Sequence, residues 1–279
     1  SNYHYLRVHR FQDVLFVTLN CPDTRNALSP DVTAELHQVS AYAQEDADLR
    51  AIVLRGSQGF FCAGGNIGSF QSRLDAHQEA VQSAATALSN QDPIAARNRE
   101  FGAFLERWSA LPVPIIAAVE GAAMGGGMGL ACTADIVLAT EDAKFALTET
   151  TLGIIPAQIA PFVQGRIGRR NALRLGMFGE RVSGPVTLVL GLVDELVANS
   201  AALDERLAFW LSRMSRCAPG ANRALKDLLS ERNTTQTLDQ MLDVASESFS
   251  TCMRHEGPEG IAAFKEKRPA RWQTSFSAT

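Results

Sequence analysis

The sequence predicts an α/β fold with a largely parallel sheet, followed by a region made only of helices. Apolar, β-branched segments typical of buried strands alternate with segments of helical periodicity up to about residue 200. Parallel strands need crossover helices, and this alternation supplies them. Beyond Asn199 the strands stop. We therefore divide the chain into a core, 1–199, and a helical region, 200–279.

The first predicted unit is a strand, a loop and a helix. VLFVTLN (14–20) is apolar and β-branched, and the turn-rich loop 20–30 follows it. Ser29-Pro30 can start a helix, and apolar residues then recur at three- and four-residue spacing as far as Ala43. This helix should bury one face.

The second unit begins with the short buried strand AIVLRG (51–56), which runs into the glycine-rich loop GSQGFFCAGGNIGSF. The alanine-rich and charge-rich segment 69–111 is expected to be helical in two pieces, with a break where Asn90 to Pro93 favour a turn. A strand framed by prolines follows at 111–121.

The remaining elements include a helix after the glycines of AAMGGGMGLACTADIVLA (122–139), a strand at 135–140, and the short segment 143–156. The helical region contains three segments with apolar stripes. Their ranges are 201–219, 220–232 and 237–256.

Composition narrows the functional classes. The 279 residues are 46% hydrophobic, enough for a sizeable core, and their net charge of −4 lacks the basic footprint of nucleic-acid or membrane-surface proteins. Five scattered cysteines without a C-x-x-C pair suit a reducing compartment, and the five histidines form no metal pattern. The N-terminal SNYHYLRVHRF has no signal-peptide core, and no apolar run reaches the roughly 18 residues of a membrane span. We expect a soluble, cytoplasmic protein without a metal site.

The glycines at 125–127 and Gly129 fit none of the common nucleotide motifs. No lysine follows them as a P-loop requires. A dinucleotide fingerprint starting at Gly125 would need glycine where Leu130 stands, and one starting at Gly127 would need it at Cys132. There is also no G-x-S-x-G nucleophile turn.

What remains is a strand, a glycine turn and a helix start, whose N–H groups lack partners within the helix. A second glycine loop, FFCAGGNI (60–67), also follows a strand. Two such loops could each donate one N–H to a single oxygen and form an oxyanion hole. The alternative is that the glycines serve only tight packing of a helix on the sheet.

Several segments together resemble the enoyl-CoA hydratase/isomerase family, also called the crotonase family, over nearly the whole chain. They are NCPDTRNALSP, GFFCAGGNIGSF, PIIAAVEGAAMGGGMGLACTADIVLA, KFALTETTLGIIPA, RIGRRNALRLGMFGERVSG, GLVDELV and EGIAAFKEKRPARW. The resemblance implies a spiral of β-β-α repeats and a C-terminal helical region that packs a homotrimer, usually as a homohexamer, a dimer of trimers. It also implies an acyl-CoA substrate, with no metal or redox cofactor.

The resemblance also assigns residues. Gly65 and Gly126 match the two oxyanion donors, and Glu149 in LTETTLG matches a catalytic glutamate, although a capping carboxylate is the alternative. Phe264, Lys265 and Lys267 match an element near the CoA phosphates, or else form an ordinary solvated helix face. The positions expected to line the CoA are Arg25, Asn26, Ala27, Leu28, Ala63, Gly65 and Ile67.

One position departs from the family pattern. Typical hydratases carry a second glutamate where this chain has Gly129. A glycine cannot transfer a proton, so Glu149 performs both transfers, another group such as Glu120 substitutes, or the reaction differs.

The motif PAQIAPFV (156–163) and the last motif resemble hydratases of branched glutaconyl-CoA substrates, 3-methylglutaconyl-CoA or isohexenylglutaconyl-CoA, in leucine or acyclic-terpene breakdown. Arg97, Arg99 or Arg166 could bind the distal carboxylate of such a substrate. The segment 69–111 should cover the acyl pocket. The alternatives are a double-bond isomerase, a decarboxylase, or a family member that binds acyl-CoA without catalysis.

Overall fold

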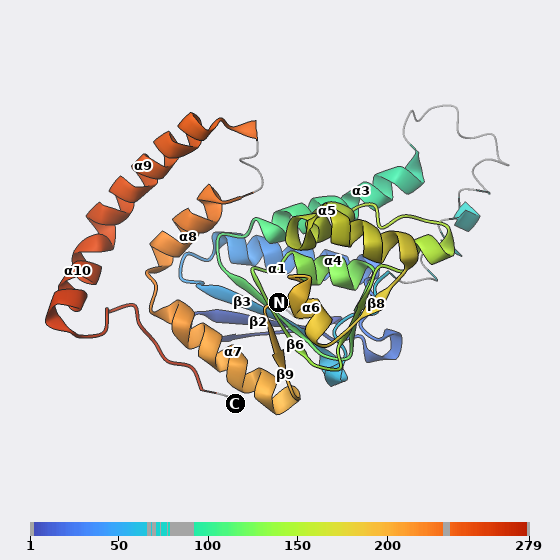
Figure 1. The fold of residues 1–279 in the computed structure, drawn as a ribbon, viewed down its shortest axis with the longest axis horizontal. Coiled ribbons are helices and arrows are strands. Elements are labelled where there is room, and N and C mark those ends of the chain that lie inside the picture. Colours follow the sequence, from blue (N-terminus) through green and yellow to red (C-terminus); the bar gives the residue numbers. More distant parts are fainter. Residues whose placement is uncertain are drawn as a thin grey trace.

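The structure is a computed structural model that describes residues 3–65, 68, 71–72, 74–76, 78, 92–230 and 235–277. Its main sheet has the strand order β1-β2-β3-β4-β6-β9 (Figure 1). β1 pairs with β2 in antiparallel fashion and all the other neighbours are parallel, which confirms the expected largely parallel sheet. The strands are β1 (Leu6–Phe11), β2 (Val14–Leu19), β3 (Ala51–Gly56), β4 (Ile115–Val119), β6 (Ile136–Thr140) and β9 (Glu195–Val197).

A smaller sheet of β5 (Ala122–Met124), β7 (Lys144–Ala146) and β8 (Arg181–Val182) lies beside it. β5 is parallel to β7, and β8 is antiparallel to β7. Because β5 follows β4 after only two residues, the chain passes directly from the large sheet to the small one. This crossing carries the glycines 125–127 to the edge of the small sheet.

Helices cover both faces of the main sheet. α1 (Pro30–Glu45), α3 (Pro93–Ser109), α4 (Gly126–Cys132) and α5 (Ala160–Phe178) lie on one face (Figure 1). On the other face, Leu203 and Leu207 of α7 (Ser200–Ser215) pack with Val53 in a second apolar cluster. The short α6 (Pro185–Val189) precedes β9.

The two predicted helix starts are found. The Ser29 hydroxyl caps α1 by accepting from Val32 N, and Pro30 occupies the first turn. The Asp92 carboxylate caps α3 by accepting from Ile94 N, so the break expected near Asn90 to Pro93 is the start of α3. The first helical piece expected in 69–111 lies largely outside the described residues.

The first strand of the main sheet was not predicted. The predicted sheet begins at residue 14, whereas β1 (Leu6–Phe11) pairs with β2 residue by residue from Leu6↔Leu19 to Phe11↔Val14. LRVHRF is rich in charge because most of its side chains are exposed at the edge of the sheet. Its composition therefore lacks the apolar signal by which the buried strands were found.

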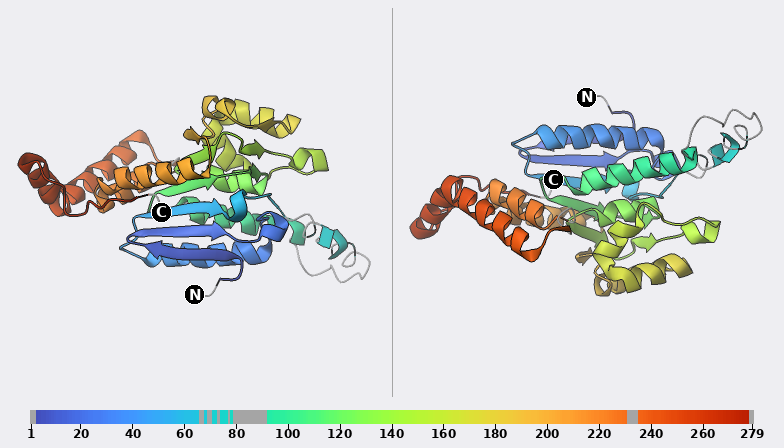
Figure 2. Two further views of the ribbon diagram at one scale, coloured as in Figure 1. Left: turned by 90° about the horizontal axis from the view of Figure 1, so that it is seen from below. Right: turned by 90° about the horizontal axis from the view of Figure 1, so that it is seen from above.

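The predicted helical segments after residue 199 correspond to α7, α8 (Pro219–Leu228) and α9 (Leu238–His255), and a further helix, α10 (Gly257–Glu266), follows them. α8, α9 and α10 project from the sheet as an arm, which both views of Figure 2 show extending to one side. We call these three helices the C-terminal arm. It carries exposed apolar side chains, including Leu238, Leu242, Phe249, Met253 and Phe264.

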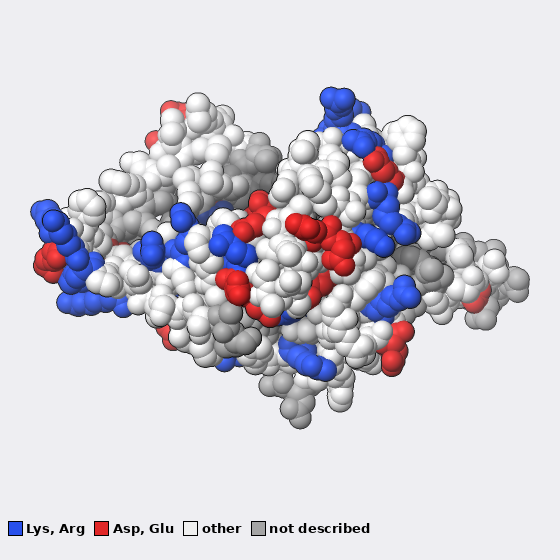
Figure 3. All heavy atoms as spheres, turned by 60° about the horizontal axis from the view of Figure 1, so that its bottom comes forward, with Lys and Arg blue, Asp and Glu red and all other residues white. Residues whose placement is uncertain are grey.

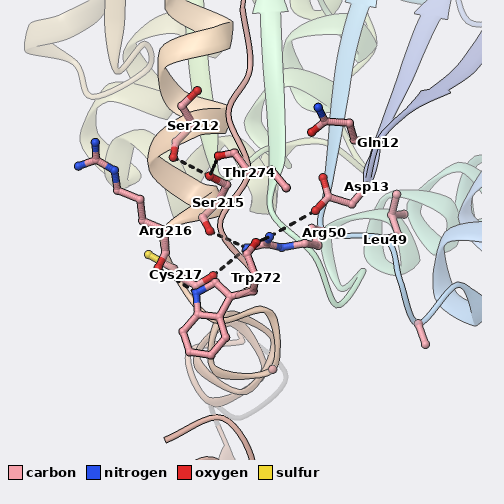
Figure 4. A network of polar contacts seen from close by, with 12 residues as sticks. Gln12, Asp13, Leu49, Arg50, Ser212, Ser215, Arg216, Cys217, Trp272 and Thr274 are labelled. Carbon is pink, nitrogen blue, oxygen red and sulfur yellow. Dashed lines mark hydrogen bonds and ion pairs between the residues drawn. The ribbon is translucent and has the colours of Figure 1, made fainter. Parts of the chain in front are cut away.

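A cluster of polar contacts ties the end of the chain back to the core (Figure 4). The guanidinium of Arg50 donates to the carbonyl oxygens of Ser215, Cys217 and Trp272, at 3.1, 2.8 and 2.5 Å. It also donates to the Asp13 carboxylate at 3.3 Å. Because Arg50 is only 8% exposed, these contacts are shielded from water and hold the Trp272 segment against the core.

The surface is mixed in charge. On the face drawn in Figure 3, acidic and basic side chains are interspersed and no large region of one sign stands out. No helix in the described part of the chain is long and apolar enough to cross a membrane.

Candidate active site

The loop after β2 is held against the loop after β3 by one buried amide. Asn26 is 1% exposed and has left-handed backbone angles. Its Oδ1 accepts from Cys21 N at 2.8 Å, while its Nδ2 donates to Phe60 O at 2.6 Å and Ser57 O at 3.2 Å. A buried amide satisfied in this way fixes the relative position of the two loops.

The same loops then continue as a short ladder. Ala63 N donates to Arg25 O at 2.9 Å, and Leu28 N donates to Gly64 O at 2.8 Å. On the other side of this segment, Cys62 N donates to Ala122 O at 2.9 Å. The segments around residues 27, 63 and 123 therefore lie side by side at one edge of the small sheet.

This ladder brings the two glycines of interest together. A methyl carbon added at Gly126 would lie 3.7 Å from Gly65 N, 3.4 Å from Leu28 Cδ1 and 3.7 Å from Phe101 Cζ. Gly126 is the first residue of α4, where the backbone N–H has no partner within the helix. Within the described ranges, neither the Gly65 nor the Gly126 N–H donates to a protein acceptor. The two N–H groups thus lie in neighbouring backbone segments without a described protein acceptor, which is what an oxyanion hole requires.

Neighbouring glycines are needed because backbone passes close to backbone. Gly64 has a φ of +92°, and a side chain there would begin 2.5 Å from Met124 O. At Gly127 it would begin 2.6 Å from Cys62 O. These two glycines serve the packing that the sequence analysis kept as an alternative, while Gly126 has ordinary space around it.

Glu149 lies directly beside this pair. It begins the 3₁₀ turn Glu149–Leu152, and its Oε1 would be 2.6 Å from a methyl carbon at Gly125, which has a φ of +48°. Gly125 therefore leaves the carboxylate room to lie against the first turn of α4. The remaining oxygen, Oε2, is buried and has no hydrogen-bond partner within the described part of the chain.

The pKa of Glu149 is raised above the usual value for a glutamate. Burial is the largest cause, because it disfavours the charged form. Hydrogen bonds from the backbone N–H groups of Glu149 and Thr148 act in the opposite direction and are the weaker influence. A carboxyl group with a raised pKa holds and releases a proton nearer neutral pH, as general acid–base catalysis requires.

The position of the absent second glutamate is filled. A methyl carbon at Gly129 would lie 2.2 Å from Ile159 Cγ2 and 2.4 Å from Ile159 Cβ. Ile159 is 3% exposed and belongs to the motif PAQIAP. Gly129 and this motif both depart from the usual family pattern. Their residues pack directly on each other, so the two departures are linked.

The Glu120 carboxylate is engaged in an ion pair. It accepts from Arg55 at 3.0 Å, and Arg55 also donates to Asp204 at 2.9 Å. Glu120 lines a separate cavity of about 600 Å³ that it shares with Arg7 and His9. The structure thus places Glu120 in an ion-pair network outside the Gly65 and Gly126 site.

The three candidate arginines are distinguished by their partners. Arg166 donates to Leu192 O at 2.7 Å and Ala134 O at 2.9 Å and pairs with Asp194, so its guanidinium is used to hold α5 in place. Arg97 is exposed on α3. Arg99 is exposed too, but its Nη1 lies near Gly102, close to the Gln158 side chain.

The residues assigned to the CoA fall into two groups. Ala27 and Leu28 are buried, Ala63 is half-buried, and the exposed Arg25 places its guanidinium 5.9 Å from the centre of the Phe60 ring. These residues flank Gly65, whereas Ile67 lies outside the described residues.

Lys267 is not brought to Gly65 within one chain. It is the exposed C-terminal cap of α10, on the C-terminal arm, at the end of the molecule opposite α3 and α5 (Figure 1). Phe264 and Lys265 are exposed on the same helix, Phe264 to 85%. Their assignment stays a prediction, and it requires a second copy of the chain.

Sequence reasoning missed Ile159 and Phe101 as neighbours of the glycines. Both are ordinary apolar residues, and only the folded chain shows that one fills the space at Gly129 and the other adjoins Gly126. Within the described ranges, no group of three or more His, Cys, Asp or Glu side chains is arranged to hold a metal ion.

Comparison with known families agrees with this geometry. The profile of the enoyl-CoA hydratase/isomerase family matches residues 10–275. The chain belongs to this family. A probable enoyl-CoA hydratase of Bacillus subtilis is 32% identical over 264 residues, which cover 94% of this chain and 96% of the relative. The 2,3-dehydroadipyl-CoA hydratase of Escherichia coli is 32% identical over 267 residues, with 94% and 96% covered.

Solved structures of the family share the fold. Pseudomonas aeruginosa AtuE has a TM-score of 0.87 and 42% sequence identity, and the match covers 97% of this chain and 100% of that one. An enoyl-CoA hydratase/isomerase from Marinobacter aquaeolei has a TM-score of 0.85 and 38% identity, with 96% and 98% covered. The protein is therefore a lyase of the enoyl-CoA hydratase type, built on the crotonase-like α/β fold.

Proposed function

We propose that this protein hydrates a branched α,β-unsaturated acyl-CoA, a 3-substituted glutaconyl-CoA such as 3-methylglutaconyl-CoA or its isohexenyl analogue. Such a reaction belongs to leucine or acyclic-terpene breakdown. The observation that supports hydration most directly is the Glu149 carboxylate with its raised pKa beside the Gly65 and Gly126 N–H groups. No metal or redox cofactor takes part in this proposal, and CoA enters as part of the substrate.

In the proposed reaction, the N–H groups of Gly65 and Gly126 bind the thioester oxygen and stabilise the enolate that forms there. The Glu149 carboxylate takes a proton from water, and the oxygen of that water bonds to the β-carbon. Protonated Glu149 then gives its proton to the α-carbon, and the enolate returns to a thioester. One carboxyl group performs both transfers, because Ile159 fills the space at Gly129.

Two observations support a substrate of the glutaconyl type. The PAQIAP motif resembles that of branched glutaconyl-CoA hydratases, and its Ile159 fills the space at Gly129, where typical hydratases carry the second glutamate. The Escherichia coli relative is named for 2,3-dehydroadipyl-CoA, whose acyl chain ends in a carboxylate as that of a glutaconyl-CoA does.

The direct test follows the loss of absorbance of the conjugated enoyl thioester with crotonyl-CoA, 3-methylglutaconyl-CoA and isohexenylglutaconyl-CoA. We expect turnover of a glutaconyl thioester by the wild type, and a decrease in kcat of about a hundredfold to ten-thousandfold in Glu149→Gln. Glu120→Gln is the matched control and should keep its activity, because Glu120 belongs to the Arg55 network. A wild type that binds CoA but hydrates none of the three thioesters would exclude the proposal.

The second candidate is a double-bond isomerase or decarboxylase, which the single carboxylate at Glu149 favours because these reactions can use one proton-transfer group. The products distinguish the candidates. Hydration in H₂¹⁸O adds labelled oxygen to the β-carbon, isomerisation moves the double bond without adding oxygen, and decarboxylation releases CO₂. Mass spectrometry of the acyl-CoA products detects hydration and decarboxylation by their mass changes, and proton NMR of the product locates the double bond after isomerisation.

We also propose that the chain assembles as a homotrimer or a dimer of trimers, with the C-terminal arm packed on a neighbouring copy. The exposed apolar side chains of α9 and α10 support this, since water-exposed surface of that kind is stabilised by burial. Such packing would let Lys267 of one copy approach the CoA of another. Light scattering on the purified protein should give three or six copies, and a stable monomer would contradict the proposal.

A further inference from the structure

A polar cluster borders the site on the side of α3, and the hydration chemistry does not use it. α3 carries Gly102 in its interior, where glycine disfavours a helix. A methyl carbon at Gly102 would lie 1.8 Å from Gln158 Oε1 and 2.8 Å from Gln158 Cδ. The Gln158 amide therefore lies directly on the backbone of α3, and the glycine is what permits it.

Asn98 lies one helical turn before Gly102 and completes this contact. Gln158 Nε2 donates to Asn98 Oδ1 at 2.9 Å, and both side chains are half-buried. Within the described ranges, the Asn98 Nδ2 group donates to no protein acceptor, and Gln158 Nε2 has one N–H left. The pair thus presents three amide N–H donors without a described partner.

Arg99 converges on the same place. Its Nη1 lies 3.3 Å from the methyl position at Gly102, the same point that Gln158 Oε1 approaches. Its described ion-pair partner is Glu106 at 3.4 Å, and both of these side chains are more than half exposed. An exposed pair at this distance holds the guanidinium weakly, so Arg99 can exchange that partner for a ligand.

The cluster is adjacent to the reacting groups. Phe101, between Asn98 and Gly102 in α3, reaches to 3.7 Å from the methyl position at Gly126. Ile159 follows Gln158 directly in the chain and packs on Gly129, one turn along α4. The Asn98 and Gln158 pair therefore lies next to the residues that border the Gly126 end of α4.

We infer that Asn98, Arg99 and Gln158 bind a carboxylate at the far end of the acyl chain. This inference rests on the proposed function, and it specifies which residues recognise the second acid group. A carboxylate only accepts hydrogen bonds, and the cluster offers amide and guanidinium donors. An acyl chain of the same length that ends in a methyl group cannot use these donors.

The test measures binding rather than turnover, with two saturated thioesters that cannot be hydrated. Glutaryl-CoA carries the terminal carboxylate, and pentanoyl-CoA has the same chain length and ends in a methyl group. By titration calorimetry, we expect Arg99→Gln to weaken glutaryl-CoA binding by about tenfold to a hundredfold, as expected for the loss of a charged hydrogen bond. Pentanoyl-CoA should bind to this variant as it does to the wild type.

Arg107→Gln is the matched control. It removes an exposed arginine from the same helix, whose side chain contacts His37 rather than the cluster, and it should change neither affinity. Gln158→Glu is a second variant and places a negative charge at the cluster. It should weaken glutaryl-CoA binding selectively, because like charges repel at short range.

Equal weakening of both thioesters in Arg99→Gln, or no change in either, would overturn the inference. So would a wild type with the same affinity for both thioesters. Because neither probe is hydrated, a protein that fails the hydration assay can still show the carboxylate preference. A protein that hydrates its substrate without this preference contradicts only the inference.

Discussion

Gly125 and Gly129 are the two ends of the glycine segment at the start of α4. Both lack a side chain, but a different residue packs against each of them. At Gly125 the absent side chain makes room for the Glu149 carboxylate, 2.6 Å from the methyl position. At Gly129 the absent side chain makes room for Ile159, 2.2 Å from the corresponding position. One glycine admits the carboxylate to which we assign proton transfer, and the other admits a packed hydrocarbon side chain. In the proposed mechanism, the chemistry is therefore concentrated at the N-terminal end of α4.

The largest effect is expected on kcat at Gly126, which lies between Gly125 and Gly129. Gly126→Ala should fold normally, because the nearest atoms to the new methyl group are 3.4 Å away or more. The methyl group would nevertheless lie 3.7 Å from Gly65 N, in the space assigned to the thioester oxygen. We expect kcat to fall by about a hundredfold or more, as for the loss of an oxyanion donor.

The thermal midpoint decides whether Gly126→Ala acts on the chemistry alone. It should stay near that of the wild type, whereas Gly64→Ala should lower it clearly, since the added carbon would lie 2.5 Å from Met124 O. Full activity in Gly126→Ala would remove this residue from the proposed oxyanion pair.

The second effect concerns stability at Gly129. Gly129→Ala should destabilise the protein by about 1–3 kcal/mol, because the new methyl group overlaps the Ile159 side chain in a packed core. Urea unfolding measures the change in the free energy of unfolding. In the double variant with Ile159→Gly, the two losses should be less than additive, because removing both Cγ2 and Cβ of residue 159 empties the space that the new methyl group needs.

Strict additivity of the two changes would show that Gly129 and Ile159 are independent, and would break the link between the missing glutamate and the PAQIAP motif.

The smallest expected effect is on the pH dependence of thermal stability, through the ionisation of Glu149. Burial raises the pKa of Glu149 in the folded protein, so between the unfolded and the folded pKa the folded state binds more protons. The charged carboxylate therefore costs stability above the folded pKa and costs nothing below the unfolded value of about 4.3. We expect Glu149→Gln to melt at a higher temperature than the wild type at neutral pH.

Thermal melts at a series of pH values test this expectation. The advantage of Glu149→Gln should shrink as the pH falls through the folded pKa and vanish below the usual range of a glutamate. An advantage that stays constant with pH would show that the change acts through something other than the charge of Glu149.

The sequence predicted most of the fold where burial leaves a regular pattern. The strands β2, β3, β4 and β6 are apolar because both faces of the parallel sheet are covered, and the starts of α1 and α3 carry a capping residue followed by proline. β1 was missed because an edge strand needs few apolar side chains. β8 and β9, with two and three residues, are too short to show a period.

For the site, motifs predicted Gly65, Gly126 and Glu149, which the structure brings close together, but contacts across the chain could not be read from these motifs. The three residues were recognisable because the segments that contain them resemble those of the family. The filling of the Gly129 space by Ile159 joins positions 30 residues apart and depends on packing that no local pattern encodes. The same is true of the Asn26 amide and of Gln158 on Gly102.

The Arg50 contacts have a consequence for how the C-terminal arm moves. Arg50 binds the carbonyl oxygens of Ser215 and Cys217, where the chain leaves α7, and that of Trp272, where it returns after α10. The arm is therefore a loop closed at its base. Arg50 shares this closure with the Ser215 hydroxyl, which donates to Thr274 O, and with the Trp272 indole N–H, which donates to Arg216 O. Replacing Arg50 with methionine would weaken the closure and raise the chain entropy of the segment between α7 and Trp272.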